Sequence, residues 1–536
     1  MAWHDIFYNS KPFNLNITIS DDVAINAVIE ELIPKIKLEP KDRNKKYLMV
    51  LILNVFSNWK MKSDMWTQFH SGVTNYKQKS RYNGNNISKL IIDIMKMMLD
   101  HGYLIQSGFL NSHEKHKKSY TARLKPTENL LGIINKHKMD FNKIEMLPDA
   151  ECIIVKKKQG KNNIQIEYED TDYLIEARED LITYNNLLRS THIDCVDIPK
   201  EAGIKIGKNK YPILVSQKNK WVQRIFIKED NKLLYGRFHL GFWQQMNREW
   251  RDKIQINGLE TTEIDYSGIG INTLYDINNL EIDDNDPYDL TGYYDSNKYS
   301  KEELRPLLKQ MLMVMINSKN YIQALKAVEK DVNDSDNGFP DDIDLKLLMK
   351  AFQNRHQPIK HLFFKSMGNI QYFLDSSICA EIIKHFTFKN IPILTVHDSF
   401  VIDIGNGDEL KEVMIDCYSK VLKNYNKEIK VTLENKQYDQ LVSRINTIFA
   451  NSKYPEPSNP VEEMHQFQQQ QYVSPYVTKH TLKDYIIEDG VGFGHKRLFK
   501  DKDYQQRLLD WRKLMIWKTD RNYYYSKNNK EKENNK

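Results

Sequence analysis

Two short acidic segments, each beside an apolar run that favours β-structure, constrain the fold of this chain more than any other feature. The first segment, residues 262–268, carries Asp265. In the second, residues 392–402, apolar runs flank Asp398 on both sides, which is typical of a β-hairpin with its turn at residues 397–399. An aspartate at a strand end or hairpin tip can point toward a shared site without entering the core. The pattern therefore predicts two strands that bring Asp265 and Asp398 together.

Such a pair of aspartates is suited to nucleotidyl transfer. In that reaction, two divalent ions roughly 4 Å apart stabilise the attacking oxygen and the leaving pyrophosphate. Mg²⁺ keeps water and substrate phosphates as ligands, so that one or two carboxylates suffice. Asp265 and Asp398 are therefore candidate metal ligands. Taken alone, however, aspartates at such positions are more often ordinary turn or capping residues.

A third segment, residues 304–318, predicts a helix with a basic face. Arg305 and Lys309 are four residues apart, so they share one face of a helix. Pro306 is expected in the first turn, where its missing N–H has no cost. Two cations one turn apart can hold a triphosphate, the arginine as a fork and the lysine as a point charge. The alternative is a solvated basic face.

A fourth segment precedes Asp265 and combines an arginine with aromatic rings and two side-chain amides. Arg237 is followed by Gln244 and Gln245. These groups suit contacts with a nucleic-acid backbone and stacking on a base. Without the neighbouring motifs, the same segment would indicate only a strand with an aromatic core.

The order of these motifs is the most informative observation. Along the chain they are Gly-Arg at 236–237, Gln-Gln at 244–245, Asp-Tyr-Ser at 265–267, Arg-x-x-x-Lys at 305–309, Gln371, and Val-His-Asp at 396–398. This combination closely resembles the palm and fingers of family A DNA polymerases. The related single-subunit, phage-type RNA polymerases share the same core. Residues 236–403 carry the resemblance.

The resemblance implies a role for each matching residue at the reacting centre. Asp265 and Asp398 would bind Mg²⁺ or Mn²⁺, and the backbone carbonyl of Tyr266 would help. Arg305 and Lys309 would bind the incoming triphosphate. Lys309 would also donate a proton to the leaving pyrophosphate.

The remaining matches would contact the nucleic acid. Arg237, Gln244 and Gln245 are expected at its backbone. Gln371 would lie near the minor groove of the primer–template duplex, and His397 near the primer terminus.

The sequence departs from the family pattern in three places. After Lys309 the family has an aromatic residue followed by glycine, whereas this chain has Met-Ile-Asn-Ser at 315–318, so we expect an altered platform for the templating base. Gly270 is expected at the binding site of the incoming nucleotide. At this position the DNA polymerases have a glutamate whose bulk excludes the 2′-hydroxyl of ribonucleotides. The RNA polymerase relatives also have a small residue there. Finally, residues 1–235 show no set of spaced carboxylates that would predict a proofreading exonuclease.

The N-terminal part of the chain predicts a small DNA-binding module. Apolar residues at helical spacing indicate helices near 48–56, 66–73 and 90–98, and residues 103–105 and 120–124 suit the strands of a hairpin. The tip of that hairpin is basic and contains Lys115, Lys117 and Lys118. This order resembles winged helix-turn-helix domains, in which a helix enters the major groove and the wing meets phosphate. The alternative is a helical module that only packs on its neighbour.

These observations divide the chain into six parts. They are an N-terminal segment (1–44), a winged-helix-like domain (45–136), a connecting or thumb-like region with a helix at 172–188 (137–235), the palm and fingers (236–450), a linker (451–480), and a basic, aromatic C-terminal segment with a polar tail (481–536). The expected fold class is α+β, a right-hand polymerase core with an N-terminal winged helix. The C-terminal segment suits base stacking, and a helix docked on the body is the alternative.

Composition bounds the location and the partners. The longest apolar run, residues 47–56, is too short to cross a bilayer, and the N-terminus lacks the pattern of a signal peptide. We expect no membrane partner and a cytoplasmic location, or the host-cell interior for a viral protein. The net charge of +6 suits a polyanionic partner, and the four cysteines lack metal-ligand spacing.

The sequence therefore predicts a family A-like DNA polymerase without proofreading, which acts on a DNA template and primer with nucleoside triphosphates. A winged helix beside a polymerase suggests replication of a mobile element, plasmid or virus. Two alternatives stay open. One is a single-subunit RNA polymerase or primer-synthesising enzyme, and the other is a non-catalytic DNA-binding replication protein with a degenerate polymerase fold.

Overall fold

The computed structural model describes most of the first 429 residues of the chain. The described residues are 6, 9–72, 75–107, 121–160, 162–195, 203–206, 209–212, 218–230, 232–266, 268–282, 286–294, 298–333, 339–340 and 342–429. They form a mixture of helices and strands, so the predicted α+β class is confirmed. Several predictions lie outside the described residues, namely the linker (451–480), the C-terminal segment (481–536), and the wing-tip lysines Lys115, Lys117 and Lys118.

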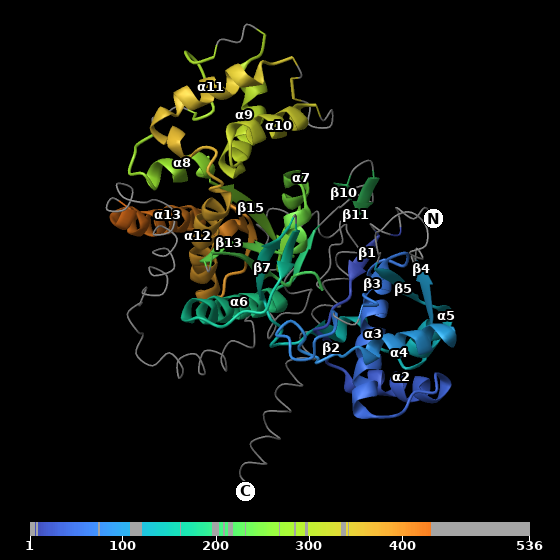
Figure 1. Cartoon of the computed structure of the whole chain (residues 1–536). Helices are drawn as coiled ribbons and strands as arrows, with labels where there is room; N and C mark the ends of the chain where they lie inside the picture. The colour runs from blue at the N-terminus through green and yellow to red at the C-terminus, as the bar shows by residue number, and fades with distance from the viewer. Residues whose placement is uncertain are drawn as a thin grey trace.

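The first part of the described chain, here called the N-terminal lobe (residues 9–147), is built around helix α3 (Figure 1). Its helices are α2 (Asp22–Lys35), α3 (Asp42–Met61), α4 (Leu90–Asp100) and α5 (Glu128–Lys136). One sheet contains, in spatial order, β1 (Ser10–Pro12), β3 (Trp66–Phe69), β5 (Ala122–Pro126) and β4 (Leu104–Ser107). A second, smaller sheet pairs β2 (Ile17–Ile19) with β6 (Ile144–Met146). A single hydrophobic core joins residues of the predicted segments 1–44 and 45–136.

The apolar face of α3 explains why this lobe folds. Leu48, Leu51, Ile52 and Val55 recur at helical spacing and are fully or almost fully buried. Burial of each such side chain stabilises the fold by about 2 kcal/mol. Helices α2 and α4 pack against α3, so the predicted helical stretches at 48–56 and 90–98 share one core.

One predicted helix of this lobe is wrong. Residues 66–69 form strand β3, which pairs with β1 on one side and with β5 on the other. Trp66 and Phe69 are three residues apart, which suits a helix, but aromatic residues and threonine also favour pleated structure, and long-range pairing decides between the two. The predicted hairpin is confirmed, since β4 pairs with β5 in antiparallel register.

Two larger sheets and three long helices form most of the central body, residues 150–265 and 368–429. It also contains the short helix α7 (Arg248–Arg251) and a two-stranded sheet of β10 (Gly203–Ile206) and β11 (Asn209–Pro212). One sheet has the order β13 (Lys232–His239), β12 (Gln223–Glu229), β7 (Ile153–Gln159) and β8 (Asn162–Gln165). The other has the order β16 (Ile393–Val396), β17 (Ser399–Asp403), β15 (Leu259–Asp265), β14 (Ile254–Ile256) and β9 (Ile193–Cys195). Helices α6 (Asp172–Ser190), α12 (Gly368–Phe388) and α13 (Gly407–Ile429) pack against these sheets.

The predicted connecting region, 137–235, is part of this body. Strands β7 and β12 and helix α6 share one hydrophobic core with the strands that carry the motifs. The Tyr184 hydroxyl of α6 donates to the Ile393 carbonyl of β16 at 2.6 Å. The Trp243 Nε1 donates to the Thr395 carbonyl at 3.0 Å. The predicted helix at 172–188 is confirmed as α6.

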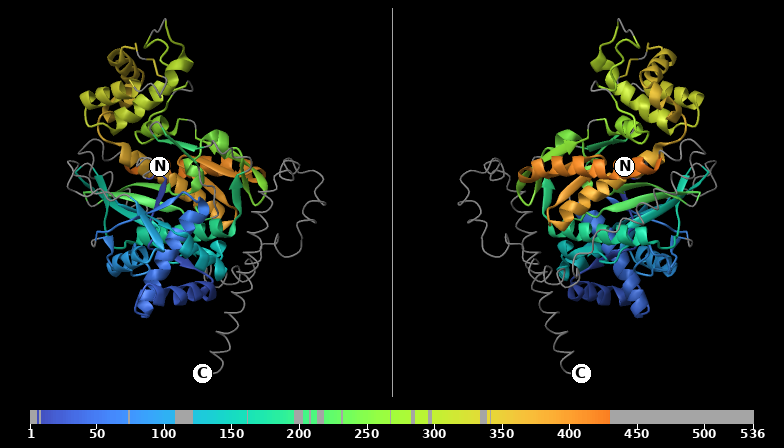
Figure 2. Two further views of the ribbon diagram at one scale, coloured as in Figure 1. Left: turned by 90° about the vertical axis from the view of Figure 1, so that its right-hand side faces the viewer. Right: turned by 90° about the vertical axis from the view of Figure 1, so that its left-hand side faces the viewer.

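A helical lobe is inserted between β15 and α12. It contains α8 (Ile269–Asp276), α9 (Lys301–Asn317), α10 (Tyr321–Val332), α11 (Leu345–Arg355) and the 3₁₀ helix η5 (Gln357–Leu362). Figure 1 shows α9, α10 and α11 on one side of the central body, and the side views of Figure 2 show the N-terminal lobe on the opposite side. None of the helices that the structure describes combines the length and the apolar character needed to span a bilayer.

A capping box sets the start of α9. The Ser300 hydroxyl accepts from the Glu303 N–H at 3.2 Å, and the Glu303 carboxylate accepts from the Ser300 N–H at 2.8 Å. Because the helix begins at Lys301, Pro306 lies inside it, beyond the first turn in which the sequence analysis placed it. That prediction was wrong because the polar cap lies further upstream than expected.

Candidate active site

Strands β15 and β17 place Asp265 and Asp398 next to each other. The two strands are antiparallel, and Asp265 is the cross-strand partner of Ser399, the residue that follows Asp398. Asp398 itself lies in the two-residue turn of the β16–β17 hairpin, which the pair Val396 and Ser399 closes. Cross-strand partners have Cα atoms about 5 Å apart, so the two aspartates share one corner of the sheet. The structure thus brings these residues together as the sequence predicts.

The turn that holds Asp398 has an unusual backbone. His397 has a φ of +62°, in the left-handed region that disfavours residues with a Cβ. Two-residue hairpin turns that match the twist of their strands need a positive φ at the first central position. Backbone conformations of this kind persist only where the surrounding structure fixes them, and they cluster at functional sites. Here the turn fixes the direction of the Asp398 backbone.

Desolvation and the neighbouring carboxylates raise the proton affinity of Asp265. Burial, followed by the negative charges of Asp398 and Glu263, raises the pKa of Asp265 to about 6. Glu263 also has a partner, since the Arg251 Nε donates to its Oε2 at 2.8 Å. A divalent cation beside Asp265 and Asp398 would relieve this repulsion, so the two side chains fit Mg²⁺ or Mn²⁺.

Asp265 and Asp398 are the carboxylates expected to bind the metal, together with the backbone carbonyl of Tyr266. No group of three or more histidine, cysteine, aspartate or glutamate side chains in the part of the chain that the structure describes could hold a metal ion. Water and substrate phosphates would therefore complete the coordination, as Mg²⁺ prefers.

A third carboxylate, Asp375 of α12, lies near the pair and was not predicted. Burial raises the pKa of Asp375 to about 6, Arg237 opposes this shift, and Asp398 and Asp265 add to it. The Arg237 Nε donates to Asp375 Oδ2 at 2.8 Å, and the guanidinium lies 4.2 Å from the centroid of the Tyr372 ring. The structure therefore places Arg237 as the counter-ion of a buried acid, a group that needs one, whereas the sequence analysis expected it on a nucleic-acid backbone.

Two histidines lie beside the acidic corner. The rings of His397 and His239 meet edge to face, with centroids 6.0 Å apart. Burial lowers the pKa of each to about 4, so both are neutral at neutral pH. The His239 Nε2 shares a 3.1 Å hydrogen bond with the Tyr235 hydroxyl. His397 Nδ1 is buried, and no described residue forms a hydrogen bond with it.

Helix α9 presents Arg305 and Lys309 on one face, as predicted. Both cations lie over the ring of Tyr288, with Arg305 Cζ 5.2 Å and Lys309 Nζ 5.8 Å from its centroid. The Arg305 Nε also donates to Asp286 Oδ2 at 2.6 Å. Asp286 and Tyr288 precede α9 and were not predicted.

The charge of Asp398 acts on Tyr288, whose ring lies under the cationic face of α9. Its side chain is 6% exposed, and burial raises the pKa of its hydroxyl to about 12. Arg305 lowers that pKa, and Asp286 and Asp398 raise it. The phenol therefore lies within electrostatic reach of both Arg305 and Asp398.

Gly270 and Gln371 are in contact. The Gln371 Nε2 donates to the Gly270 carbonyl, and a Cβ added at Gly270 would lie 3.1 Å from that nitrogen. Gln371 is 6% exposed, and no described residue forms a hydrogen bond with its buried Oε1. Tyr266 is anchored through its hydroxyl, which donates to the Met414 carbonyl at 2.6 Å. Its backbone follows Asp265 directly.

The two neighbouring glutamines have different environments. The Gln244 Nε2 donates to the Phe238 carbonyl at 3.0 Å and to the Thr395 carbonyl at 3.2 Å, which fixes the 3₁₀ helix η3 (Phe242–Gln245) to the sheet. Gln244 is therefore engaged inside the protein, whereas it was expected on a nucleic-acid backbone. Gln245 is exposed and available for such a contact.

Comparison with known proteins does not assign this site. No protein-family model matches the chain, and no curated protein matches it either. The assignment of a function therefore depends on the arrangement of the side chains described above.

Proposed function

We propose that this protein is a template-directed nucleic-acid polymerase that uses two-metal nucleotidyl transfer. One observation carries the proposal. Asp265 and Asp398 share a corner of the sheet, and Tyr288 lies within electrostatic reach of Asp398. The same tyrosine ring lies under both cations of α9. This arrangement supports a single site in which the two aspartates would bind metal and the two cations would bind the triphosphate.

The residues of the site would divide the chemistry between them. Bound at Asp265 and Asp398, Mg²⁺ or Mn²⁺ would activate the attacking 3′-oxygen and stabilise the leaving pyrophosphate. Arg305 would exchange the carboxylate of Asp286 for phosphate oxygens, because both groups suit its planar fork. Lys309 would hold the triphosphate as a point charge and donate a proton to the pyrophosphate as it leaves.

DNA is the product in the leading version of the proposal, in keeping with the resemblance to family A DNA polymerases. RNA is the second candidate, and Gly270 favours it. At this position the helix carries no side chain that could exclude a 2′-hydroxyl. The Oε1 of the adjacent Gln371 could accept a hydrogen bond from such a hydroxyl. The N-terminal lobe, with its β4–β5 hairpin, would bind duplex DNA in the manner of a winged helix, and the enzyme would serve a mobile element, plasmid or virus.

Primer extension tests the proposal. Purified full-length protein is incubated with a primed DNA template, Mg²⁺, and either dNTPs or NTPs. We expect extension by the wild type and a loss of about 1,000-fold or more in Asp265→Asn and in Asp398→Asn, because each change removes a metal ligand. Asp252→Asn, which changes an exposed aspartate of the same body, is the matched control and retains activity.

Circular dichroism and thermal melting establish that each variant is folded. If the folded wild type makes no product from any of the eight nucleotides yet retards duplex DNA in a gel, the chain is a non-catalytic DNA-binding protein. If Asp265→Asn and Asp398→Asn extend primers at the wild-type rate, the two aspartates are not metal ligands and the proposed site is wrong.

A further inference from the structure

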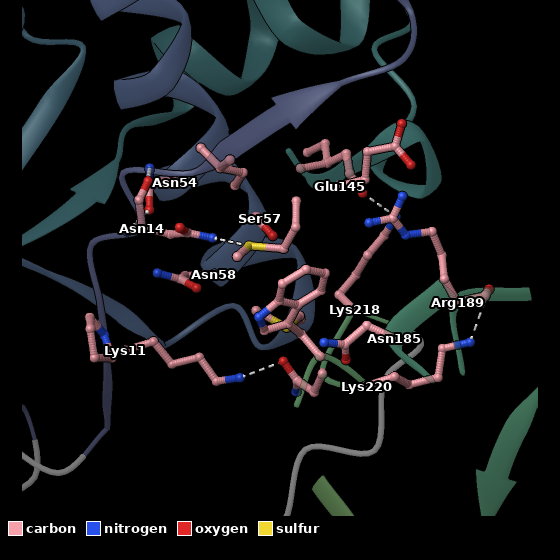
Figure 3. Close-up of a pocket in the computed structure, with 17 residues that line it drawn as sticks. Lys11, Asn14, Asn54, Ser57, Asn58, Glu145, Asn185, Arg189, Lys218 and Lys220 are labelled. Atoms are coloured by element: carbon pink, nitrogen blue, oxygen red, sulfur yellow. Dashed lines mark hydrogen bonds between the residues drawn. The ribbon is translucent and has the colours of Figure 1, made fainter. Parts of the chain in front are cut away.

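A cavity of about 240 Å³ lies between the N-terminal lobe and the central body (Figure 3). On one side its walls are β1, α3 and β6, and on the other they are the end of α6 and residues 218–221. None of the residues that line it belongs to the candidate active site. Its volume is below the roughly 300–1,000 Å³ that is usual for pockets of drug-sized ligands, so it suits a small molecule.

Basic side chains dominate the charge of this cavity. Among the described residues that line it, the charged ones are Lys11, Arg189, Lys218, Lys220 and Glu145. The ammonium groups of Lys218 and Lys220 donate to backbone carbonyls, including that of Asn142 at 2.5 Å. The Lys11 Nζ donates to the Asn219 Oδ1 at 2.8 Å, so a lysine of one lobe is bound to an amide of the other.

Two of the cations have no acidic partner among the described residues. No ion pair between described residues includes Lys11 or Arg189. Burial lowers the pKa of Lys11 to about 8, as expected for an ammonium that is removed from water without a counter-charge. Two donors at the cavity, Arg189 Nη2 and Trp221 Nε1, are buried, and no described residue accepts a hydrogen bond from either. Unsatisfied buried donors of this kind are rare and require an explanation.

We propose that this cavity binds a small phosphate monoester, whose phosphate is held by Lys11 and Arg189 and whose uncharged body lies against Trp221. The site is separate from the candidate active site and does not depend on the proposed polymerase activity.

A phosphate explains the donors better than water does. A water molecule would satisfy one or two donors but would leave the charges of Lys11 and Arg189 uncompensated. A phosphate monoester offers three strongly accepting oxygens and nearly two negative charges, which suits an arginine fork together with a lysine point charge. Lys218 and Lys220 also line the cavity and add to its positive potential.

The rest of the lining suits the uncharged part of such a ligand. Pro12, Met61 and Met146 provide apolar surface, and the Trp221 ring provides a flat face with an N–H at its edge. Methionine side chains adapt to ligands of varied shape. Because the phosphate would join Lys11 of the N-terminal lobe to Arg189 of the central body, binding would also hold the two parts together.

Isothermal titration of the full-length protein with phenyl phosphate tests this proposal, in EDTA and on an Arg305→Ala background that weakens the other phosphate site. Inorganic phosphate and phenol are the comparison ligands. We expect phenyl phosphate to bind at least about tenfold more tightly than inorganic phosphate, and phenol not to bind. Arg189→Gln and Lys11→Gln should each weaken binding by about tenfold or more, because each removes charge-assisted hydrogen bonds. Lys96→Gln, an exposed lysine of the N-terminal lobe, should leave the affinity unchanged.

A local probe keeps the test valid if one of the variants folds poorly. Trp221 is one of 8 tryptophans, so its resonance in 5-fluorotryptophan-labelled protein can be identified with Trp221→Phe. We expect phenyl phosphate to shift this resonance and phenol to leave it in place. An unshifted resonance, binding of phenol as tight as that of phenyl phosphate, or an affinity that Arg189→Gln leaves within twofold would each overturn the proposal.

Discussion

The Asp286 carboxylate forms an ion pair with the guanidinium of Arg305, and Asp286 Oδ2 lies 2.6 Å from Arg305 Nε. Both side chains are more than a third exposed, at 40% and 37%. An exposed pair of this kind contributes little to the stability of the fold, so an anion in solution can displace the aspartate. The pair therefore holds the arginine in place and at the same time competes with any phosphate that approaches it.

Removal of this competitor should increase the affinity for nucleotide. In Asp286→Ala the Arg305 fork has no protein carboxylate to release, so we expect the KM for the incoming nucleotide to fall about three- to tenfold, while kcat stays within a factor of two. Steady-state primer extension at varied nucleotide concentration measures both constants. The matched control is Asp289→Ala, which breaks the neighbouring Lys301–Asp289 pair of 2.7 Å and should leave KM unchanged. A KM that rises in Asp286→Ala would show that the aspartate supports the nucleotide site.

Gly270 allows a direct test of sugar selection. A glutamate at this position would have its Cβ 3.1 Å from Gln371 Nε2 and its carboxylate further out along the surface of α8. We expect Gly270→Glu to lower the ratio of ribonucleotide to deoxyribonucleotide incorporation by about tenfold or more, because the added bulk would meet the 2′-hydroxyl. Gly270→Ala adds only the Cβ and should change the ratio much less. Equal ratios in the wild type and in Gly270→Glu would rule out a steric role for this position.

His356 should be needed to hold the segment that carries Asp286 and Tyr288. This histidine is fully buried; its Nδ1 shares a 3.0 Å hydrogen bond with the Tyr275 hydroxyl, and its Nε2 lies 2.8 Å from the Pro287 carbonyl. His356→Phe keeps a ring in the core but leaves both partners unsatisfied, so we expect a loss of about 2–4 kcal/mol in the free energy of unfolding. Urea denaturation measures this loss. The exposed His361 provides the control, since His361→Phe should have almost no effect on stability.

The cavity lysine leads to a prediction on pH. The pKa of Lys11 is about 8 in the folded protein, below its ordinary value of 10.5, because burial penalises the ammonium. Between these two pH values the unfolded chain holds a proton that the folded chain has lost, so the stability of the wild type should rise with pH from about 8 to 10. Below pH 8 the full cost of the buried charge is present.

Lys11→Met should therefore stabilise the ligand-free protein most at neutral pH. We expect a gain of about 1–3 kcal/mol at pH 7, which becomes smaller as the pH is raised to 10. Thermal melting in a series of phosphate-free buffers follows the change. Lys96→Met, on the exposed surface of α4, should give no such trend. A gain that does not change with pH would show that Lys11 is compensated by another group.

Local patterns in the sequence were sufficient for part of the fold and of the site. The helical spacing of apolar residues predicted α3 and α4, and the apolar runs on both sides of Asp398 predicted the β16–β17 hairpin. The spacing of Arg305 and Lys309 placed them on one helical face. In each case residues within a few positions of one another decide the structure, because a helix or a hairpin is formed by local hydrogen bonds.

The site residues that the sequence did not predict come to lie at the site through tertiary packing. Asp375 lies in the middle of α12, a helix that is buried on nearly all sides and therefore shows little amphipathic pattern. Asp286 and Tyr288 lie in a segment without regular structure, and only the fold of the helical lobe brings them to α9. His239 could have been found from the sequence. It follows Tyr235 and Arg237 at a spacing of two residues along β13 and so shares their face.

Long-range pairing explains why the prediction of a helix at residues 66–73 was wrong. Strand β3 forms because β1 and β5 lie on either side of it, and these partners come from distant parts of the chain. Nothing within the segment itself distinguishes a short helix from a short central strand.

The pairing of β15 with β17 over five residue pairs makes the candidate active site sensitive to strand alignment. A slip of a single residue would displace Asp398 by about 3.4 Å relative to Asp265 and would turn every side chain of β17 to the opposite face. An insertion or deletion of one residue in either strand would therefore separate the two aspartates although every acidic and basic side chain is still present. Under the proposed function, the number of residues between each aspartate and the end of its strand is as good a mark of an intact site as the aspartates themselves.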